Sequence, residues 1–353
     1  MLYSGFIKKV VVMKKSNFIS KIFFWVAGAF FVCAFVLLFA HTFYNDKYSN
    51  AIHGFNNPGS EFLVPDKTGA SILMVSDTGS NDILLRAIID NAFRSKKYDF
   101  VMYLGDLTKN ASITGYYWML DEIKPSLGNV PMYTIPGNHE ISRRIGMSHS
   151  FFKDKSFYET VMGARYYWFG YGNTLFVTLD SSDETLDDKQ LVWLENTLKK
   201  IRPMFRNCII IGHVPPANSR PDFFADHIMT ADTNKKFESI IKKYKINAMF
   251  FGHVHFYSRG SFAGVDFYTT PSSGQSIRDL ENPKYGYMSV DIDKNGKVSV
   301  MPGYIDFVGQ RRHNFAEWFA RDVLSVRVRM VISVALILSL VSLVIGFVFR
   351  SRR

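Results

Sequence analysis

The sequence predicts an α/β domain with substantial parallel strand pairing, flanked by two apolar transmembrane helices. Three observations carry this prediction. Short apolar runs alternate with helical patterns from residue 71 onward. Two uncharged apolar runs, residues 22–40 and 330–349, are each long enough to cross a bilayer as a helix. Between them, polar residues follow one apolar run after another, which is typical of a ligand site at the carboxyl ends of parallel strands.

The strands are predicted from short apolar runs bounded by turn residues. These runs are SILMV (71–75), DFVMYL (99–104), PMYTI (131–135), TLFVTL (174–179), CIII (208–211) and AMFF (248–251). The segments 265–271 and 285–303 are expected to close the sheet, the second as a hairpin over DKNGK. Helices are expected over residues 83–92 and 187–201, where apolar residues recur at helical spacing.

Composition and charge divide the chain into seven segments. These are a basic N-terminus (1–21), a transmembrane helix (22–43), a linker (44–69), the globular domain (70–311), an amphipathic helix beside the membrane (312–329), a second transmembrane helix (330–349) and a basic tail (350–353). Two of them allow another interpretation. The first apolar run could be a cleaved signal sequence, although it exceeds the usual length and LLFAHTF is a poor cleavage site. Residues 312–329 could instead form a terminal helix packed on the domain.

The net charge of +11 belongs to the segments beside the membrane. Residues 1–21 hold five lysines and no acidic residue, and residues 311–353 hold eight arginines against two acidic residues. The remainder is therefore neutral, so we expect no nucleic-acid partner. The positive-inside rule predicts two spans of the cell membrane, with both termini in the cytosol and the domain on the extracytoplasmic side.

Acids, an amide and imidazoles follow five of the predicted strands. They are Asp77, Asp106, Asn138, His139, His213, His253 and His255. Each one alone could be a turn residue or a satisfied core residue, but the carboxyl ends of parallel strands meet at one rim. Carboxylate, amide and imidazole donors without thiolates suit Mn, Fe or Zn. A carboxylate can bridge two cations about 3.5–4 Å apart, and such a pair can clamp the oxygens of a phosphoryl group.

The ordered fragments SDTG, GDLTKN, GNHE, GHVPP and GHVH resemble the calcineurin-like metallophosphoesterases over roughly residues 71–305. GNHE and GHVH are the most specific of them. The resemblance implies a β-sandwich flanked by helices, with two divalent metal ions (Mn, Fe or Zn) at the strand ends. It implies hydrolysis of phosphate mono- or diesters by attack of a metal-bound hydroxide.

The resemblance also implies a role for each matched residue. Asp106 would bridge the two metals, and Asp77 and His255 would hold the first. The second metal would be completed by Asn138, His213 and His253.

The residues around GNHE would carry the catalytic and substrate-binding roles. His139 would protonate the departing alkoxide or stabilise the transition state, and Glu140 would orient it. Arg143 and Arg144 follow this loop and are candidates to bind a second phosphate or a lipid headgroup, the other interpretation being a solvated loop.

One position departs from the family pattern. Many members have a histidine two residues after the first aspartate, where this chain has Gly79. Purple acid phosphatases share this Asp-x-Gly motif but supply a tyrosine at the position occupied here by Lys109. The first metal is therefore one protein ligand short, unless water or Asp82 fills the place.

Two functions follow from these patterns. The first is a membrane-anchored, metal-dependent phosphoesterase whose substrate is a phosphoester in or near the bilayer, such as a lipid or cell-envelope phosphate. The second is a catalytically weak domain of the same fold that binds or senses at the membrane, an alternative based on the incomplete first-metal ligand set.

Overall fold

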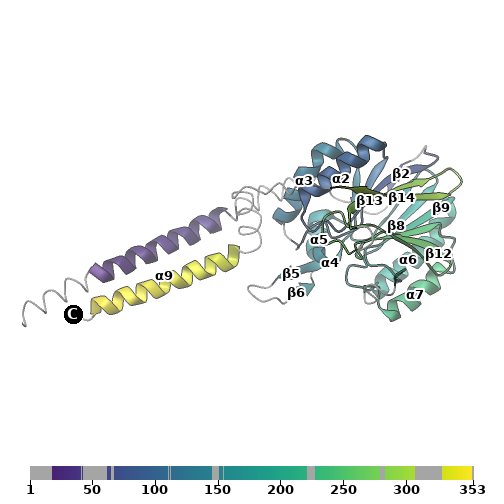
Figure 1. The fold of residues 1–353 in the computed structure, drawn as a ribbon. Helices are drawn as coiled ribbons and strands as arrows, with labels where there is room; N and C mark the ends of the chain where they lie inside the picture. Colours follow the sequence, from purple (N-terminus) through teal and green to yellow (C-terminus); the bar gives the residue numbers. More distant parts are fainter. Residues whose placement is uncertain are drawn as a thin grey trace, which may run out of the picture. The chain divides into compact units, whose positions relative to one another are not determined.

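The structure, a computed structural model, describes residues 18–40, 42, 62–64, 67–109, 111, 113–144, 151–153, 155–220, 227–278, 283–306 and 328–351. The chain separates into two compact units (Figure 1). One is Tyr48–Arg312, and the other combines Met1–Lys47 with His313–Arg353. Most of the helix predicted at 312–329 lies outside the described residues.

A five-stranded sheet carries the first three site fragments. Its strand order is β14 (Val298–Ile305), β13 (Tyr285–Ile292), β2 (Ala70–Val75), β3 (Phe100–Tyr103) and β4 (Met132–Thr134). Strands β2, β3 and β4 pair in parallel, while β13 and β14 form the predicted hairpin and pair antiparallel. The carboxyl ends of the three parallel strands therefore meet at one rim.

A seven-stranded sheet carries the remaining fragments. Its order is β1 (Phe62–Val64), β7 (Trp168–Tyr171), β8 (Thr174–Thr178), β9 (Asn207–Ile211), β10 (Ala248–Phe251), β12 (Val265–Thr269) and β11 (Ser258–Phe262). Strands β8, β9, β10 and β12 are parallel neighbours. Strand β1 lies inside the segment predicted as a linker and pairs with β7.

The two sheets pack face to face, because alternate residues of each strand point to opposite sides. In β2, Ile72 and Met74 join one cluster with Phe176 and Ile209 of the seven-stranded sheet. The intervening residue Leu73 faces the opposite side. Burial on both faces explains why the strands are continuous apolar runs.

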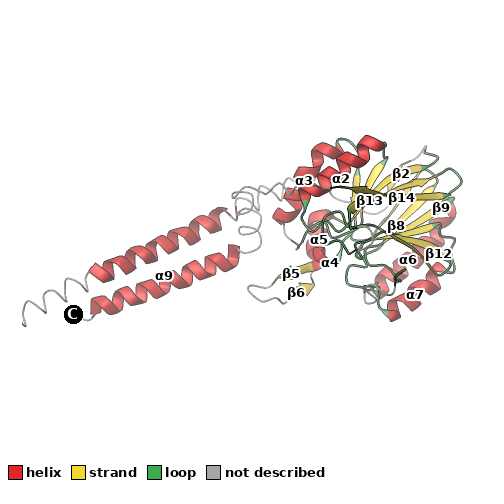
Figure 2. Cartoon of the chain, in the orientation of Figure 1, coloured by secondary structure: helices red, strands yellow, loops and turns green. Residues whose placement is uncertain are grey.

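Helices cover the two outer faces of the sandwich (Figure 2). The five-stranded sheet packs against α2 (Asp82–Ser95) and α3 (Ile113–Leu127), and the seven-stranded sheet packs against α6 (Asp188–Lys200) and α7 (Ala231–Ile241). Shorter elements are α4 (Asn138–Ile141), α5 (Lys155–Met162), the 3-10 helix Arg202–Met204 and the hairpin of β5 (Ser142–Arg144) with β6 (Phe151–Lys153). The predicted β-sandwich flanked by helices is confirmed.

The expected helix at 187–201 begins at a side-chain cap. Asp187 accepts a 2.8 Å hydrogen bond from the backbone amide of Gln190, which satisfies one of the free amides at the start of α6. Its apolar side, Leu191, Leu194 and Leu198, is buried. Helices α3 and α7 were not predicted.

The other unit contains two helices long and apolar enough to cross a membrane, Phe18–Ala40 and a span of α9 (Val328–Ser351). They pack antiparallel: the Ser20 hydroxyl donates to the carbonyl of Gly346 at 2.9 Å, and the Ser339 hydroxyl donates to that of Ala27 at 3.0 Å. The contact holds small residues together with the aromatic pairs Phe23–Phe349 and Phe24–Phe347, and other large apolar side chains such as Trp25 are exposed. Small residues where two apolar helices meet are common in pairs of membrane-spanning helices.

Candidate active site

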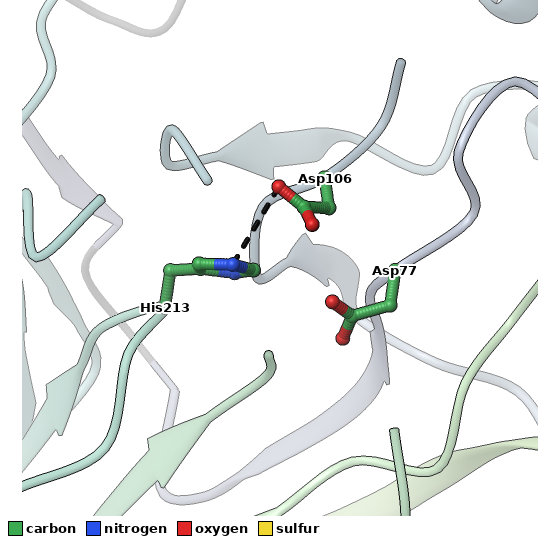
Figure 3. A group of neighbouring side chains, drawn as sticks. All are labelled: Asp77, Asp106 and His213. Atoms are coloured by element: carbon green, nitrogen blue, oxygen red, sulfur yellow. Dashed lines mark ion pairs between the residues drawn. The ribbon is translucent and has the colours of Figure 1, made fainter. Parts of the chain in front are cut away.

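The six predicted metal-ligand residues lie just beyond the carboxyl ends of strands from both sheets, five of them in loops and Asn138 at the start of α4. Asp77, Asp106 and Asn138 follow β2, β3 and β4, and His213, His253 and His255 follow β9 and β10. Asp77, Asp106 and His213 are buried and offer ligand atoms that all lie within 4.8 Å of one another. Figure 3 shows both carboxylates and the imidazole directed toward a common space.

One half of this site is built around the Asn138 amide. Its Oδ1 lies 3.1 Å from His213 Nε2 and 3.1 Å from His253 Nδ1. His213 Nε2 is also 3.5 Å from Asp106 Oδ1. Burial and the neighbouring His213 lower the pKa of His253 well below its usual value, which keeps that imidazole neutral and able to bind a metal.

The other half is built around Asp77. Its Oδ1 lies 3.3 Å from His255 Nε2, and its Oδ2 accepts the backbone amide of His253 at 3.0 Å. Burial by itself raises the pKa of Asp77, but the charge and hydrogen bond of His255 outweigh it, so the pKa is lowered overall. A carboxylate at this position is therefore ionised in the folded protein.

In two of the imidazoles, the Nδ1 atom already makes a hydrogen bond to a backbone carbonyl. His213 Nδ1 lies 2.7 Å from the carbonyl of Leu104, and His255 Nδ1 lies 2.7 Å from that of Ser276. A carbonyl only accepts, so each Nδ1 carries the proton, and each Nε2 points at an oxygen of the cluster. Where these Nε2 atoms face the oxygens of Asn138 and Asp77, a positive charge is needed between them, supplied by a proton on Nε2 or by a metal ion.

The backbone of this rim is held in an uncommon conformation. Asp77, Asp106, His253 and His255 have φ angles of 55°, 61°, 69° and 63°. Residues with side chains adopt such angles at a cost of about 1–3 kcal/mol each, and they cluster where a site requires them. Four of the six predicted ligands are thus held by the surrounding fold in strained geometry.

The donor set and its geometry fit divalent metal ions. Asp77, Asp106 and His213 could hold one ion directly. Under the predicted assignment, Asp77, Asp106 and His255 would hold a first ion, and Asp106, Asn138, His213 and His253 would hold a second. These oxygen and imidazole donors suit Mn, Fe or Zn. The carbonyls behind His213 and His255 are the outer partners that fix the tautomer of a metal-binding histidine.

His139 lies beside this cluster, partly open to solvent. Its Nε2 is 3.8 Å from Asp106 Oδ2, and the exposed fraction of its side chain is 34%. Burial lowers the pKa of His139, but the charge of Asp106 and the 2.8 Å hydrogen bond from Nδ1 to the Lys109 carbonyl outweigh it, so the pKa is raised. A protonated, partly exposed imidazole is suited to donate a proton to a leaving oxygen.

Glu140 differs from its expected role of orienting His139. Its buried carboxylate accepts the backbone amides of Asp106 at 2.6 Å, Thr108 at 2.9 Å and Gly137 at 2.8 Å. Burial and the charge of Asp106 raise the pKa of Glu140 to about 7. Glu140 therefore ties the loop after β3 to the loop after β4, and the Lys109 carbonyl holds the His139 ring.

Arg143 and Arg144, predicted to bind substrate, lie in β5 and pair with β6. Their side chains are outside the described part of the structure. Lys109, which stands where purple acid phosphatases have a tyrosine, meets His139 through its backbone carbonyl.

The structure adds a loop that sequence patterns missed, residues 272–278 after β12. The Gln275 amide donates to Asp106 Oδ2 at 3.2 Å, and Arg278 Nη1 donates to the His253 carbonyl at 3.3 Å. Burial lowers the pKa of Arg278, while the charges of Asp77 and Asp106 act in the opposite direction. Because β12 is a parallel neighbour of β10, its carboxyl end lies at the same rim. The rule that ligand sites lie at the carboxyl ends of parallel strands, which located the other fragments, therefore also applies to this loop.

A further histidine joins the site from outside the five fragments. His227 Nδ1 lies 3.1 Å from His253 Nε2, the ring nitrogen that does not face Asn138. The position follows the undescribed segment 221–226, and no motif marked it.

The sequence model of the family described as calcineurin-like phosphoesterase matches residues 70–257. The chain therefore belongs to this family of metal-dependent hydrolases of phosphate esters, and the prediction of a metal-dependent phosphoesterase is confirmed. It is 28% identical over 189 residues to a "Probable cyclic nucleotide phosphodiesterase" from Fibrobacter succinogenes, covering 53% of this chain and 69% of that protein.

One further relative carries a phosphodiesterase name, and one solved structure shares the fold. The chain is 26% identical over 174 residues to a "Probable glycerophosphodiester phosphodiesterase" from Arcobacter nitrofigilis, covering 45% of this chain and 57% of the relative. A purple acid phosphatase from yellow lupin seeds has the same fold, with a TM-score of 0.53, 16% identity, and coverage of 68% of this chain and 54% of its own.

Proposed function

We propose that the chain is a membrane-anchored hydrolase of phosphate esters that uses two divalent cations held by the six rim residues. One observation carries the proposal. Buried imidazole nitrogens face carboxylate and amide oxygens, while their other nitrogens already donate to the carbonyls of Leu104 and Ser276. A proton could supply the missing positive charge at one position, but the repetition in both halves of the rim favours two metal ions.

The residues of the chain then have distinct tasks. Bound cations would neutralise phosphate charge and make water a nucleophile at neutral pH. Asp106 offers a ligand atom within 4.8 Å of those of Asp77 in one half and His213 in the other, which supports its binding of both ions. His139 donates its Nε2 proton to the leaving oxygen, and the Lys109 carbonyl keeps its Nδ1 protonated.

Phosphodiesters are the first substrate class to test, because the two relatives named above carry phosphodiesterase names. Arg278 supplies a fixed positive charge beside Asp77 and Asp106 and is the candidate to bind a non-bridging phosphate oxygen. A lipid or cell-envelope phosphodiester would agree with the two apolar helices of the chain.

The test compares the full chain, purified in detergent, with two variants. Wild type loaded with Mn²⁺ should retain about two ions per chain and release nitrophenol from bis-nitrophenyl phosphate. His213→Ala should lose the second ion and the activity. Lys243→Ala is the matched control, since that exposed side chain pairs with Glu195 of α6 at 2.7 Å on the outer face of the sandwich. Wild type that retains no ion and turns over no faster than His213→Ala would refute the proposal.

The membrane part has its own test. We propose two spans with both termini in the cytosol, supported by the antiparallel packing of helix Phe18–Ala40 with α9. In a variant lacking both native cysteines, Met204→Cys, whose parent side chain is 70% exposed, should react with an impermeant maleimide in intact cells. Ser351→Cys should react only after lysis. The reverse pattern would contradict this topology.

A further inference from the structure

The rim contains a second amide side chain whose position coincides with the missing ligand of the first metal. At Gly79, which replaces the histidine expected by resemblance, the backbone φ is +56°. A Cβ at this position would lie 2.5 Å from Cγ of Gln275. The space that a side chain at 79 would need is thus filled by a residue almost two hundred positions later in the sequence.

Gln275 contacts both carboxylate residues of the first metal position. Its side-chain Nε2 donates to Asp106 Oδ2 at 3.2 Å, and its backbone amide donates to the Asp77 carbonyl at 2.7 Å. Gln275 is half-buried. By contrast, Asp82 lies in the first turn of α2, where its carboxylate accepts the amide of Ile83.

The loop that presents Gln275 is fixed in place on both sides. The backbone amide of Ser273 donates to the Ser76 carbonyl at 2.9 Å, and the Ser276 carbonyl accepts from His255 Nδ1 at 2.7 Å. Ser272 Oγ donates to the Asp77 carbonyl at 3.2 Å. Such anchoring means that little conformational entropy is lost when Gln275 binds a ligand at the rim.

From this geometry we infer that Gln275 is a ligand of the first metal, beside Asp77, Asp106 and His255. The inference rests on the proposed function. Rotation of the terminal amide by 180° exchanges Nε2 and Oε1, so the carbonyl oxygen takes the place that now faces Asp106. Oε1 and Asp106 Oδ2 would then both be free to hold a cation, in place of the hydrogen bond between the two side chains. The chain thus supplies from the loop after β12 the ligand that Gly79 cannot.

The identity of this ligand affects metal choice. An amide oxygen in place of an imidazole makes the first position richer in oxygen, and oxygen ligands suit Mn²⁺ more than Zn²⁺. The first position should therefore retain Mn²⁺ in preference to Zn²⁺ more strongly than the second, which holds His213 and His253.

The test is an Mn²⁺ titration of the full chain in detergent, followed by electron paramagnetic resonance of free and bound ion. Wild type should bind two ions, and Gln275→Ala should bind one of them about 10- to 100-fold more weakly. Gln275→Glu should keep both, because a carboxylate can replace the amide oxygen as a ligand. Lys243→Ala is again the matched control, since that exposed side chain pairs with Glu195 of α6 at 2.7 Å on the outer face of the sandwich.

The outcomes separate this inference from the proposed function. Retention of the second ion by Gln275→Ala shows that the variant is folded. Two ions bound by Gln275→Ala as tightly as by wild type would overturn the inference alone. Equal weakening in Gln275→Glu and Gln275→Ala would also overturn it, because Gln275 would then act only as a donor to Asp106. Wild type that binds no Mn²⁺ would instead overturn the proposed function.

Discussion

The two halves of the site each contain one amide side chain, and the two amides reach the rim by different routes. Asn138 belongs to the GNHE motif directly after β4 and contacts His213 and His253 at 3.1 Å each. Gln275 comes from a loop after β12 that carries no recognised motif and contacts Asp106 at 3.2 Å. Residues in equivalent chemical positions can therefore differ completely in how visible they are in the sequence.

The difference also has an energetic side. The Asn138 half joins loops from both sheets, since Asn138 follows β4 and its two histidines follow β9 and β10. The first-metal half holds Asp77, which is ionised, and the neutral amide of Gln275, which comes from a separate loop. We expect loss of Asn138 to remove an ion that the reaction needs, and loss of Gln275 to weaken an ion that two carboxylates still attract.

The largest expected effect comes from replacing each of these two amide side chains with alanine. Asn138→Ala should lower kcat/KM for a nitrophenyl phosphodiester by at least about 10³-fold, because bound cations contribute several kcal/mol to the transition state. Gln275→Ala should lower it by roughly 10- to 100-fold at limiting Mn²⁺ and recover at high Mn²⁺. Steady-state kinetics over a range of Mn²⁺ concentrations measures both. Recovery of Asn138→Ala at high Mn²⁺ would remove the contrast between the halves.

The next effect concerns the proton donor, which belongs to neither metal position. His139→Ala should lower kcat by about 10²- to 10³-fold with nitrophenyl esters and leave the metal content at the wild-type level. Because a nitrophenolate needs little protonation, the loss should be greater for an alkyl ester. Parallel measurements of kcat and of bound metal check this expectation, and a fall in metal content would make His139 a ligand instead.

A smaller effect is expected at Arg278, on the same loop as Gln275. Arg278→Ala should raise KM roughly 10-fold with little change in kcat, the size expected for one charge-assisted hydrogen bond to phosphate. Arg278→Lys keeps the charge without the planar fork and serves as the control. An unchanged KM in Arg278→Ala would assign this side chain to holding the His253 carbonyl, which it contacts at 3.3 Å.

The smallest effect is on stability. Removal of Mn²⁺ with EDTA should lower the melting temperature of the wild type by roughly 5–10 °C, since an ion at a hundred times its Kd adds about 2.7 kcal/mol. Asn138→Ala and Gln275→Ala should each show a reduced shift, because each binds one ion weakly or not at all. Scanning calorimetry measures the shift, and an unchanged shift in either variant would contradict its place in the site.

Most of the sheet was predictable because its strands are buried on both faces and therefore appear as apolar runs. The runs at 71–75, 99–104 and 248–251 became β2, β3 and β10. Strand β1 was not predicted, because three residues at a sheet edge leave little pattern. Helices α3 and α7 were missed too, although both pack against the sandwich.

The role of Glu140 shows a limit of a different kind. Its place beside His139 in GNHE suggested contact with that ring, yet its carboxylate binds the backbone amides of Asp106, Thr108 and Gly137. Adjacent residues in a tight turn point in different directions, and only the backbone angles decide which neighbour each side chain meets.

The sequence by itself determined the chemistry of this protein. Polar residues placed directly after apolar strands reach the rim whatever the details of the fold, because parallel strands end together. The tertiary structure alone decided which sheet supplies each ligand, which carbonyl holds each imidazole, and that Gln275 fills the space above Gly79. These contacts join residues far apart in the chain, and their formation depends on the packing of two sheets, which leaves no local pattern in the sequence.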